Sequence, residues 1–359
     1  MRSVSIAMAT YNGAAYLADQ LQSLARQTKL PAELVVADDG STDETLAILA
    51  AFSHSAPFPV HVVRNDSRLG YRANFMKAVG LCTSDLIAYC DQDDVWFDSK
   101  LQHCVEQLDA SGALMLYHNA VVTDSALVAT DTLDKHGAPA AYNPPLTMSP
   151  LSHLFGFTIL FDRRLTQFIP LWEKSISYLD GQSREAHDQW TCFLANALGA
   201  VFYEAQPLAN YRRHGSTATL TAWAGAPFVA RALNALHVYF HSSEFLARWE
   251  NQAIMLEHRA AILDEIAADC LSPFANEARA GAGKYHGYAR LHRDRIALYK
   301  ATTVGARLRR FRGILASGGY RNADVWAKGT KSALKDLLIG VLRTNRILPN
   351  RTQPTPTPN

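Results

Sequence analysis

The sequence lacks the marks of several protein classes. Its five cysteines are odd in number, and no two of them stand in a Cys-x-x-Cys spacing. This pattern indicates neither a disulfide framework nor a zinc site. No apolar stretch approaches the roughly 20 residues that a membrane-spanning helix needs, and the first residues are more typical of a strand than of a secretory signal. We therefore expect the protein to stay in the cytoplasm.

Acidic residues are scarce in the carboxyl-terminal part. From Lys284 to Asn359 the chain has 16 Lys and Arg against 3 Asp, whereas the residues before it have 19 basic against 30 acidic side chains. A basic helix predicted at 324–342, with Trp326 and several leucines, is typical of segments that lie on an anionic membrane surface. We expect peripheral attachment to the cytoplasmic face of the inner membrane. The alternative is an ordinary surface helix packed on the preceding domain.

Strands and helices alternate in the first hundred residues. Apolar or β-branched runs predict strands at 4–8, 34–37, 60–63 and 86–90, and helical spacing of apolar residues predicts helices at 16–25, 44–52 and 74–82. Such alternation indicates a mostly parallel sheet with helices on both faces. Beyond it we expect strands at 113–117, 155–161, 201–203 and 208–211, helices at 96–110, 164–172 and 187–198, and loops at 125–150 and 175–186.

From Pro227 the pattern becomes helical, with long segments at 228–241, 245–269 and 273–300. We therefore expect an α/β domain at 1–222, a helical and basic region at 223–345, and a disordered tail rich in Pro and Thr at 346–359. The helical region could also form a homodimer interface.

Three carboxylates, Asp91, Asp93 and Asp94, directly follow the predicted strand 86–90. Like charges this close repel one another unless a cation is held among them, and a hard divalent metal prefers oxygen ligands. The alternative is an acidic turn in which Asp94 or Asp98 caps the next helix. Ligands of parallel sheets lie beyond the carboxyl ends of the strands. Polar clusters at 10–12, 38–43 and 91–94 follow three such ends, so we expect them to converge on one crevice.

Six motifs in this order resemble an inverting family 2 glycosyltransferase of the GT-A fold, over roughly residues 2–220. The closest resemblance is to the rhamnosyltransferases of bacterial surface polysaccharides. The motifs are Thr10-Tyr11-Asn12, Asp38 to Asp43, Asn65 with Gly70 and Asn74, Asp91 to Trp96, His187 to Trp190, and Tyr211 to Gly215. The resemblance implies a Rossmann-like, mostly parallel sheet flanked by helices, with the helical region as an extension. It also implies a nucleotide-sugar donor, Mg²⁺ or Mn²⁺, a glycan or lipid-linked glycan acceptor, and no nucleic-acid partner.

The resemblance also implies roles for single residues. Asp93 would be the chief metal ligand, with Asp91 and Asp94 as partners and His214 reaching the metal or the pyrophosphate. Asp188 would be the base that takes the proton of the acceptor hydroxyl. Asp39 would accept a hydrogen bond from the pyrimidine N–H, and Tyr11 would stack on the base. The other positions expected around the nucleotide are Thr10, Asn12, Gly70, Arg72, Asn74, Asp91, Gln92, Arg212 and Arg213.

Several alternatives stay open at this point. The donor is best matched by dTDP-rhamnose, but UDP-glucose, UDP-galactose or an amino-sugar donor would meet almost the same base pocket. A nucleotidyltransferase also uses carboxylate-bound metal, although no Gly-rich basic loop follows the first strand. A catalytically silent scaffold of polysaccharide assembly is a third interpretation. Asp188 would then only cap its helix, and His214 would be structural.

Overall fold

The computed structural model describes residues 2–134, 140–152, 154–215, 242–321 and 329–343. These divide into two compact units. The first takes the described residues of 1–177, 182–221 and 258–284, and the second takes those of 178–181, 222–257 and 285–359.

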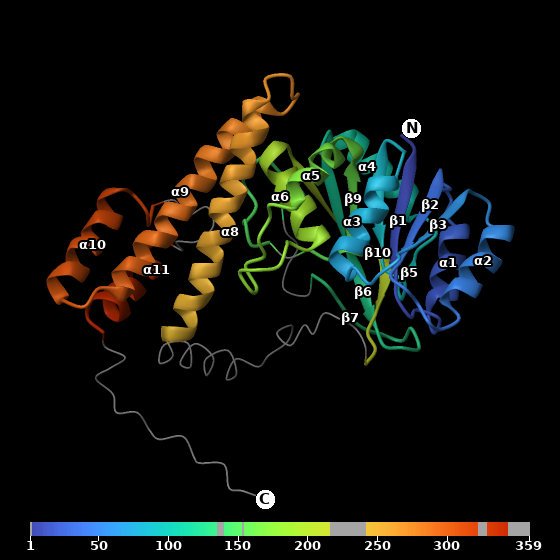
Figure 1. Cartoon of the computed structure of the whole chain (residues 1–359), viewed down its shortest axis with the longest axis horizontal. Coiled ribbons are helices and arrows are strands. Elements are labelled where there is room, and N and C mark those ends of the chain that lie inside the picture. Colours follow the sequence, from blue (N-terminus) through green and yellow to red (C-terminus); the bar gives the residue numbers. More distant parts are fainter. Residues whose placement is uncertain (1, 135–139, 153, 216–241, 322–328, 344–359) are drawn as a thin grey trace, which may run out of the picture. The chain divides into compact units, whose positions relative to one another are not determined.

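One mixed sheet runs through the first unit, with the strand order β3-β2-β1-β4-β9-β6-β10-β5 (Figure 1). Its strands are β1 (Val4–Thr10), β2 (Glu33–Asp38), β3 (Val60–Arg64), β4 (Leu86–Cys90), β5 (Val95–Trp96), β6 (Met115–Thr123), β9 (Ile159–Asp162) and β10 (Val201–Arg212). The run β3-β2-β1-β4 is parallel throughout, as is the pair of β6 with β10. The strand β9 is antiparallel to both β4 and β6.

Alternating side chains of the central strands serve opposite faces of the sheet, because successive residues of a strand point to opposite sides. Val4, Ile6 and Met8 of β1 belong to the main hydrophobic cluster, together with side chains of α1 (Leu17–Ala25), α2 (Thr45–Ser55) and α4 (Lys100–Ser111). On the other face, Tyr89 of β4 meets Phe75 of α3 (Tyr71–Leu81) and His187 of α6 (His187–Leu198). Helices on both faces therefore bury the parallel strands.

Several expected boundaries differ from the structure. The segment 125–150, expected to hold loops only, contains β7 (Ala129–Thr132) and β8 (Tyr142–Asn143), which pair with β6 and β10. Residues 95–96, expected to start a helix, form β5 because they pair with β10, and α4 begins at Lys100. The expected strand 155–161 begins with a 3-10 turn at Gly156–Thr158, and 164–172 is a 3-10 turn (Arg163–Phe168) followed by α5 (Ile169–Trp172).

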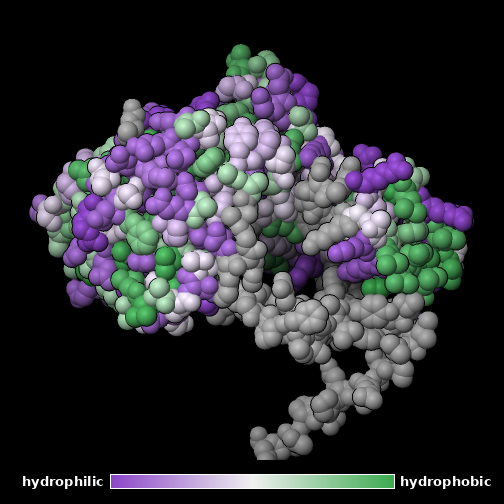
Figure 2. Space-filling view, turned by 180° about the vertical axis from the view of Figure 1, so that it is seen from behind, coloured by the Kyte–Doolittle hydropathy of each residue, from purple (hydrophilic) through white to green (hydrophobic). Residues whose placement is uncertain are grey.

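Helices make up the described residues beyond 241. They are α8 (Ser242–Ala268), α9 (Ala275–Lys300), α10 (Val304–Ala316) and α11 (Thr330–Lys335), which continues as a π-helix over Asp336–Val341. In the second unit, Leu298, Phe311 and Ile314 centre a small core that joins α9, α10 and the π-helix. Figure 2 shows hydrophobic residues beside hydrophilic ones over α10 and α11. None of the described helices is long and apolar enough to cross a membrane. The helix expected at 228–241 and the tail at 346–359 lie outside the described residues.

Candidate active site

The carboxyl ends of β1, β2 and β4 meet at one edge of the sheet. In the parallel register, Thr10 of β1 pairs with Asp38 of β2, and Met8 pairs with Cys90 at the end of β4. The Thr10 hydroxyl donates to Asp38 over 2.9 Å, and the Thr42 amide donates to the Asn12 side chain over 2.8 Å. The polar clusters after β1 and β2 are therefore bonded to each other.

The third cluster is joined to the first through Gln92. Its side-chain oxygen accepts from the Tyr11 amide over 3.0 Å, and its side-chain nitrogen donates to the Tyr11 carbonyl over 3.2 Å. Gly13 leaves room for this side chain, since a methyl group there would collide with the Gln92 amide. The three clusters therefore come together at one edge of the sheet, as the sequence predicts.

Asp39 is buried and holds the loop that follows β3. Its carboxylate accepts from the Asn65 side chain over 2.9 Å, from the Leu69 amide over 2.7 Å and from the Gly70 amide over 2.8 Å. Gly70 has a φ of 81°, a left-handed conformation that suits glycine. A carboxylate offers about four acceptor positions. The three bonds leave one for a ligand, so the predicted contact with a pyrimidine N–H has room.

A cleft of about 440 Å³ opens beside Tyr11 and Asp39. Its other lining residues are Gly40, Arg64, Asn65, Asp66, Ser67 and Arg68. The Arg68 guanidinium lies 3.9 Å from the centre of the Tyr11 ring, a cation–π contact. The sequence-based reasoning did not single out Arg64 or Arg68. The signal was available, because both arginines stand at the carboxyl end of a predicted parallel strand.

The carboxylates after β4 lie in a crowded and partly buried position. Burial raises the pKa of Asp91 to about 8, and the charges of Asp93 and Asp188 add to the shift. Burial also raises the pKa of Asp94 well above its usual range, with Asp93 and Asp91 as further causes. One Asp94 oxygen accepts from the Arg212 amide over 3.0 Å, whereas Oδ2 is buried without a hydrogen-bond partner. Neither Asp94 nor Asp98 caps α4, whose N-cap residue is Ser99.

A buried lysine lies beneath these carboxylates. Lys100 is 2% exposed, and its ammonium group donates to the Phe157 carbonyl over 2.6 Å and lies 3.5 Å from the centre of the Trp96 ring. Burial lowers the pKa of Lys100 to about 8, while the charges of Asp94 and Asp91 act against that shift. Lys100 thus supplies part of the positive charge that this acidic group needs.

The donor chemistry of this group fits a hard divalent cation. Among the described residues, Asp94 Oδ2 has no hydrogen-bond partner, and the pKa of Asp91 is raised first by burial and then by the neighbouring carboxylates, so a cation here would stabilise the charged forms. The His214 ring lies 2.8 Å from the Asp93 carboxylate and 4.5 Å, centre to centre, from the Tyr16 ring. In the described part of the chain, however, no three His, Cys, Asp or Glu side chains are already arranged around one point. The ligands would therefore have to draw together on binding.

Asp188 lies in the first turn of α6, beside the end of β4. The Tyr89 hydroxyl of β4 lies 2.8 Å from the Thr191 hydroxyl and donates to the His187 carbonyl over 3.4 Å. These contacts hold α6 so that the Asp188 charge contributes to the raised pKa of Asp91. Asp188 does not cap the helix, whose N-cap residue is Ala186. The expected base therefore lies near Asp91, one of the expected metal ligands.

Other predicted residues bond mainly within the protein. The Asn74 side chain donates to the Ala37 carbonyl over 2.7 Å and accepts from Asn65 over 2.8 Å. The Arg212 guanidinium is buried, donates to Asp19 over 2.8 Å and lies over the Tyr16 ring. Arg72 donates to the Arg184 carbonyl over 2.7 Å, and Arg213 is exposed. Asn74 and Arg212 thus hold the walls of the crevice in place.

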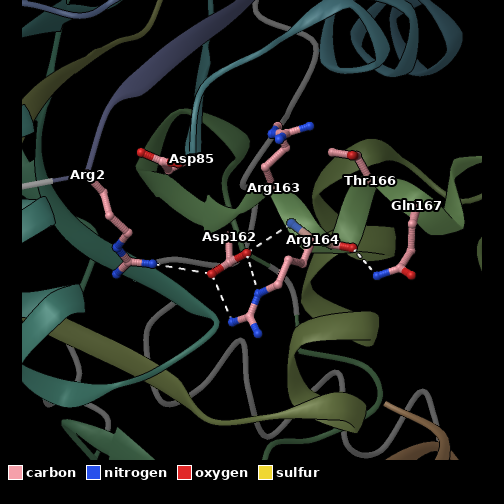
Figure 3. Close-up of a pocket in the computed structure, with 7 residues that line it drawn as sticks. All are labelled: Arg2, Asp85, Asp162, Arg163, Arg164, Thr166 and Gln167. Carbon is pink, nitrogen blue, oxygen red and sulfur yellow. Dashed lines mark hydrogen bonds and ion pairs between the residues drawn. The ribbon is translucent and has the colours of Figure 1, made fainter. Parts of the chain in front are cut away.

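A second cavity, of about 590 Å³, lies at the opposite edge of the sheet, where β1 and β4 begin. Figure 3 shows Arg2 and Arg164 converging on Asp162 there, at distances of 3.3 Å and 2.9 Å. None of the predicted site residues lines this cavity. Its charged groups largely neutralise one another, so the carboxyl edge remains the candidate active site.

This geometry defines the class of the first unit: an α/β domain with a cleft and an acidic cluster at the carboxyl edge of its parallel strands. Residues 5–167 match the family model "Glycosyl transferase family 2". The match covers less than half of the chain, and this part of the chain is similar to that family. The match and the sheet topology together confirm the GT-A fold class, a mostly parallel sheet flanked by helices with a helical carboxyl-terminal region.

Three known proteins show how far the similarity extends. The dTDP-rhamnosyl transferase RfbG of Shigella flexneri is 32% identical over 118 residues, which is 32% of this chain and 41% of RfbG. The amylovoran biosynthesis glycosyltransferase AmsB of Erwinia amylovora is 25% identical over 224 residues, 58% of this chain and 69% of AmsB. A crystal structure of TarS from S. aureus matches 81% of this chain and 91% of that chain, with 16% identity and a TM-score of 0.49.

The similarity does not extend over whole proteins. The chain spans 37% to 59% of the length of curated relatives that are at least 30% identical to it, RfbG among them.

Proposed function

We propose that this protein is an inverting, metal-dependent glycosyltransferase that transfers a sugar from a nucleoside diphosphate to a glycan hydroxyl. The observation that supports this most directly is the position of Asp188. The charge of Asp188 lies near enough to Asp91 to contribute to the raised pKa of that carboxyl, and the cleft beside Tyr11 and Asp39 opens at the carboxyl edge of the same sheet. A donor held there would have its nucleoside in the cleft and its diphosphate beside the acidic cluster.

Each side chain of the site would have a separate role in the transfer reaction. The acceptor oxygen attacks the anomeric carbon while the bond from that carbon to the diphosphate oxygen breaks. The hydroxyl proton passes to the Asp188 carboxylate, and the nucleoside diphosphate leaves with the bonding electrons. A divalent cation bound by Asp93 and His214, with Asp91 and Asp94 as partners, would stabilise the charge that develops on the leaving diphosphate.

For the donor we propose dTDP-rhamnose first. The supporting observation is the similarity to RfbG, named as a dTDP-rhamnosyl transferase, although it covers less than half of that protein. A UDP-sugar is the second candidate within the same site, because a single carboxylate and an aromatic ring recognise thymine and uracil almost alike. AmsB, a polysaccharide biosynthesis enzyme by name, supports a glycan or lipid-linked glycan acceptor. We place the reaction at the cytoplasmic face of the inner membrane, where such acceptors are assembled.

Donor hydrolysis tests the proposal. The purified protein is incubated with dTDP-rhamnose, UDP-glucose or UDP-N-acetylglucosamine, with and without Mn²⁺, and the released nucleoside diphosphate is measured. We expect release from dTDP-rhamnose that needs the metal and falls by about 10³-fold or more in Asp188→Asn. The variant should still bind dTDP, which a metal-dependent rise in its melting temperature would report.

Three results would contradict the proposal. No release from any donor in the presence of a glycan acceptor would favour the silent scaffold. Full activity in Asp188→Asn would remove Asp188 from the role of base. Formation of a sugar nucleotide from sugar phosphate and nucleoside triphosphate would instead identify a nucleotidyltransferase.

A further inference from the structure

The second unit carries leucines on its surface at helical spacing. Leu334, Leu338 and Leu342 follow one another every four residues along α11 and the π-helix, and are 56%, 37% and 53% exposed. On α10, which packs against the π-helix through the core that contains Phe311, Leu315 is 47% exposed. Soluble surfaces tolerate single exposed leucines, but a set of them on adjoining helices marks an interaction surface.

The charges around these leucines have one sign. Arg309, Arg310, Arg312, Arg321 and Lys331 are exposed. Among the described residues of 301–343 there is one carboxylate, Asp336. Figure 2 shows hydrophilic residues adjoining the hydrophobic ones over these helices.

That one carboxylate is not available at the surface. Asp336 is fully buried, and it accepts from both the Nε and an Nη atom of Arg295 over 2.6 and 2.9 Å. The hydroxyls of Tyr299 and Tyr320 donate to it over 2.9 and 2.8 Å. The described surface of α10 and α11 therefore presents cations and apolar side chains without a compensating anion.

We infer that the surface formed by α10 and α11 binds the headgroup layer of an anionic lipid bilayer. The leucines would enter the boundary between headgroups and acyl chains, and the arginines would contact lipid phosphates. The inference rests on the proposed function in one respect. Binding to the bilayer would hold the candidate active site near a lipid-linked acceptor. A bilayer fits better than an acidic protein, because leucines can enter its acyl boundary while the surrounding cations attract its anionic headgroups.

Sedimentation with vesicles tests the inference on the full chain. One vesicle is an equal mixture of phosphatidylcholine and phosphatidylglycerol, and the other is phosphatidylcholine alone. We expect binding to the mixed vesicles only, and it should weaken as salt is added because salt screens the cations. The triple variant Leu334→Ser, Leu338→Ser, Leu342→Ser should lower the partition coefficient by about tenfold or more. The triple variant Arg309→Gln, Arg310→Gln, Arg312→Gln should lower it by about tenfold in low salt.

Matched changes elsewhere serve as controls. Leu271→Ser replaces a leucine that is 90% exposed in the first unit, and Arg26→Gln with Arg163→Gln removes exposed cations there. These should change the partition coefficient by less than about twofold, because their positions lie outside the proposed surface. Equal binding to both vesicles, or triple variants that bind as the controls do, would overturn the inference. So would a leucine variant that turns a dimer into a monomer without any vesicle binding.

Donor hydrolysis by the same variants separates the two proposals. Both triple variants should hydrolyse the donor like the unmodified protein, since the changes lie outside the crevice. Vesicle binding without donor hydrolysis in the unmodified protein would sustain the lipid surface and refute the transferase. Donor hydrolysis without vesicle binding would support the transferase and refute the lipid-binding surface.

Discussion

Single side chains at the carboxyl edge of the sheet decide where a ligand can bind. Asp39 uses three of its acceptor positions on the loop after β3, and that loop carries Arg68 onto the Tyr11 ring. One face of Tyr11 is therefore already covered by a cation. A base would stack on the other face, with Arg68 free to place its charge near the phosphates.

Replacement of Arg68 tests this arrangement. We expect Arg68→Ala to weaken nucleoside diphosphate binding by about 1 kcal/mol, roughly fivefold in Kd, because a cation–π contact and a charge near the phosphates are lost. Calorimetric titration of the protein with dTDP and with UDP measures this change in Kd. Arg163→Ala, in the cavity at the opposite edge, is the control and should leave Kd unchanged. Unchanged or tighter binding in Arg68→Ala would show that Arg68 only covers the empty cleft.

His187 makes stability depend on pH. Burial lowers its pKa to about 4, it is stacked 3.8 Å from Phe75, and neither ring nitrogen has a hydrogen-bond partner. Because the folded pKa lies below the unfolded value, the unfolded state binds more protons, and this contribution to stability is lost as pH falls from about 6.5 towards 4.

We therefore expect the unmodified protein to lose about 2–3 kcal/mol more than His187→Leu between pH 7.5 and 4.5. Urea unfolding of both proteins at the two pH values measures the difference. Other groups titrate in the same range, so only the difference between the proteins is diagnostic. Parallel losses in the two proteins would mean that His187 is protonated in the fold.

The helix that carries Asp188 is anchored by an ion pair from α8. Glu185, which stands just before α6, is fully buried and receives two hydrogen bonds from Arg259, at 2.7 and 3.0 Å. Arg259 also donates to the Pro150 carbonyl over 2.7 Å and lies 4.7 Å from the centre of the Phe193 ring. A helix of the carboxyl-terminal region thus fixes the first turn of α6.

Removal of one partner should be costly. We expect Arg259→Met to lower the free energy of unfolding by about 3–5 kcal/mol, because Glu185 is left buried without a counterion. The double variant Glu185→Met, Arg259→Met should recover most of that stability. We expect the kcat of the double variant for donor hydrolysis to be about tenfold lower than that of the unmodified protein, with an unchanged KM, because Asp188 loses its fixed position. Full recovery of kcat in the double variant would limit the ion pair to a role in folding.

Elements differ in how well the sequence predicts them. The strand at 86–90 is predicted to the residue, because a buried parallel strand shows as a continuous apolar run with polar residues after it. The sequence does not predict β5, β7 or β8, since short strands depend on distant partners such as β6 and β10. Two strands are expected at 201–203 and 208–211, whereas the structure has the single strand β10, whose register with β6 shifts between Glu204 and Asn210.

The same distinction applies to the site. Convergence of the clusters at 10–12, 38–43 and 91–94 follows from the parallel order of the strands, so the sequence predicts it. The inward direction of Asn74 and Arg212 does not follow, because a polar residue at the start of a helix or at the end of a strand can face either the ligand or the wall. Arg64 ends β3, but Arg68 lies on the loop after it, whose path is set by hydrogen bonds to Asp39, a residue distant in the sequence.

At the scale of the whole molecule, the boundary expected at 222 does not separate two sets of contacts. Residues 258–284, which belong to α8 and α9, group with the first unit. Lys284 donates to the Leu146 carbonyl over 2.7 Å, and Arg259 pairs with Glu185. The first unit therefore includes a helical hairpin that lies far along the chain from the residues that match the family model.

Two fragments test this division. A fragment of residues 1–222 would leave Glu185 buried without Arg259, and would expose the side chains that 258–284 cover. We expect it to be less stable in urea than residues 1–300 by about 3–5 kcal/mol, the cost of breaking a buried ion pair. Residues 1–300 should retain dTDP binding, because this fragment includes the crevice and the whole hairpin, and should lose vesicle binding with α10 and α11. Equal stability of the two fragments would show that residues 1–222 fold on their own and that the hairpin only covers them.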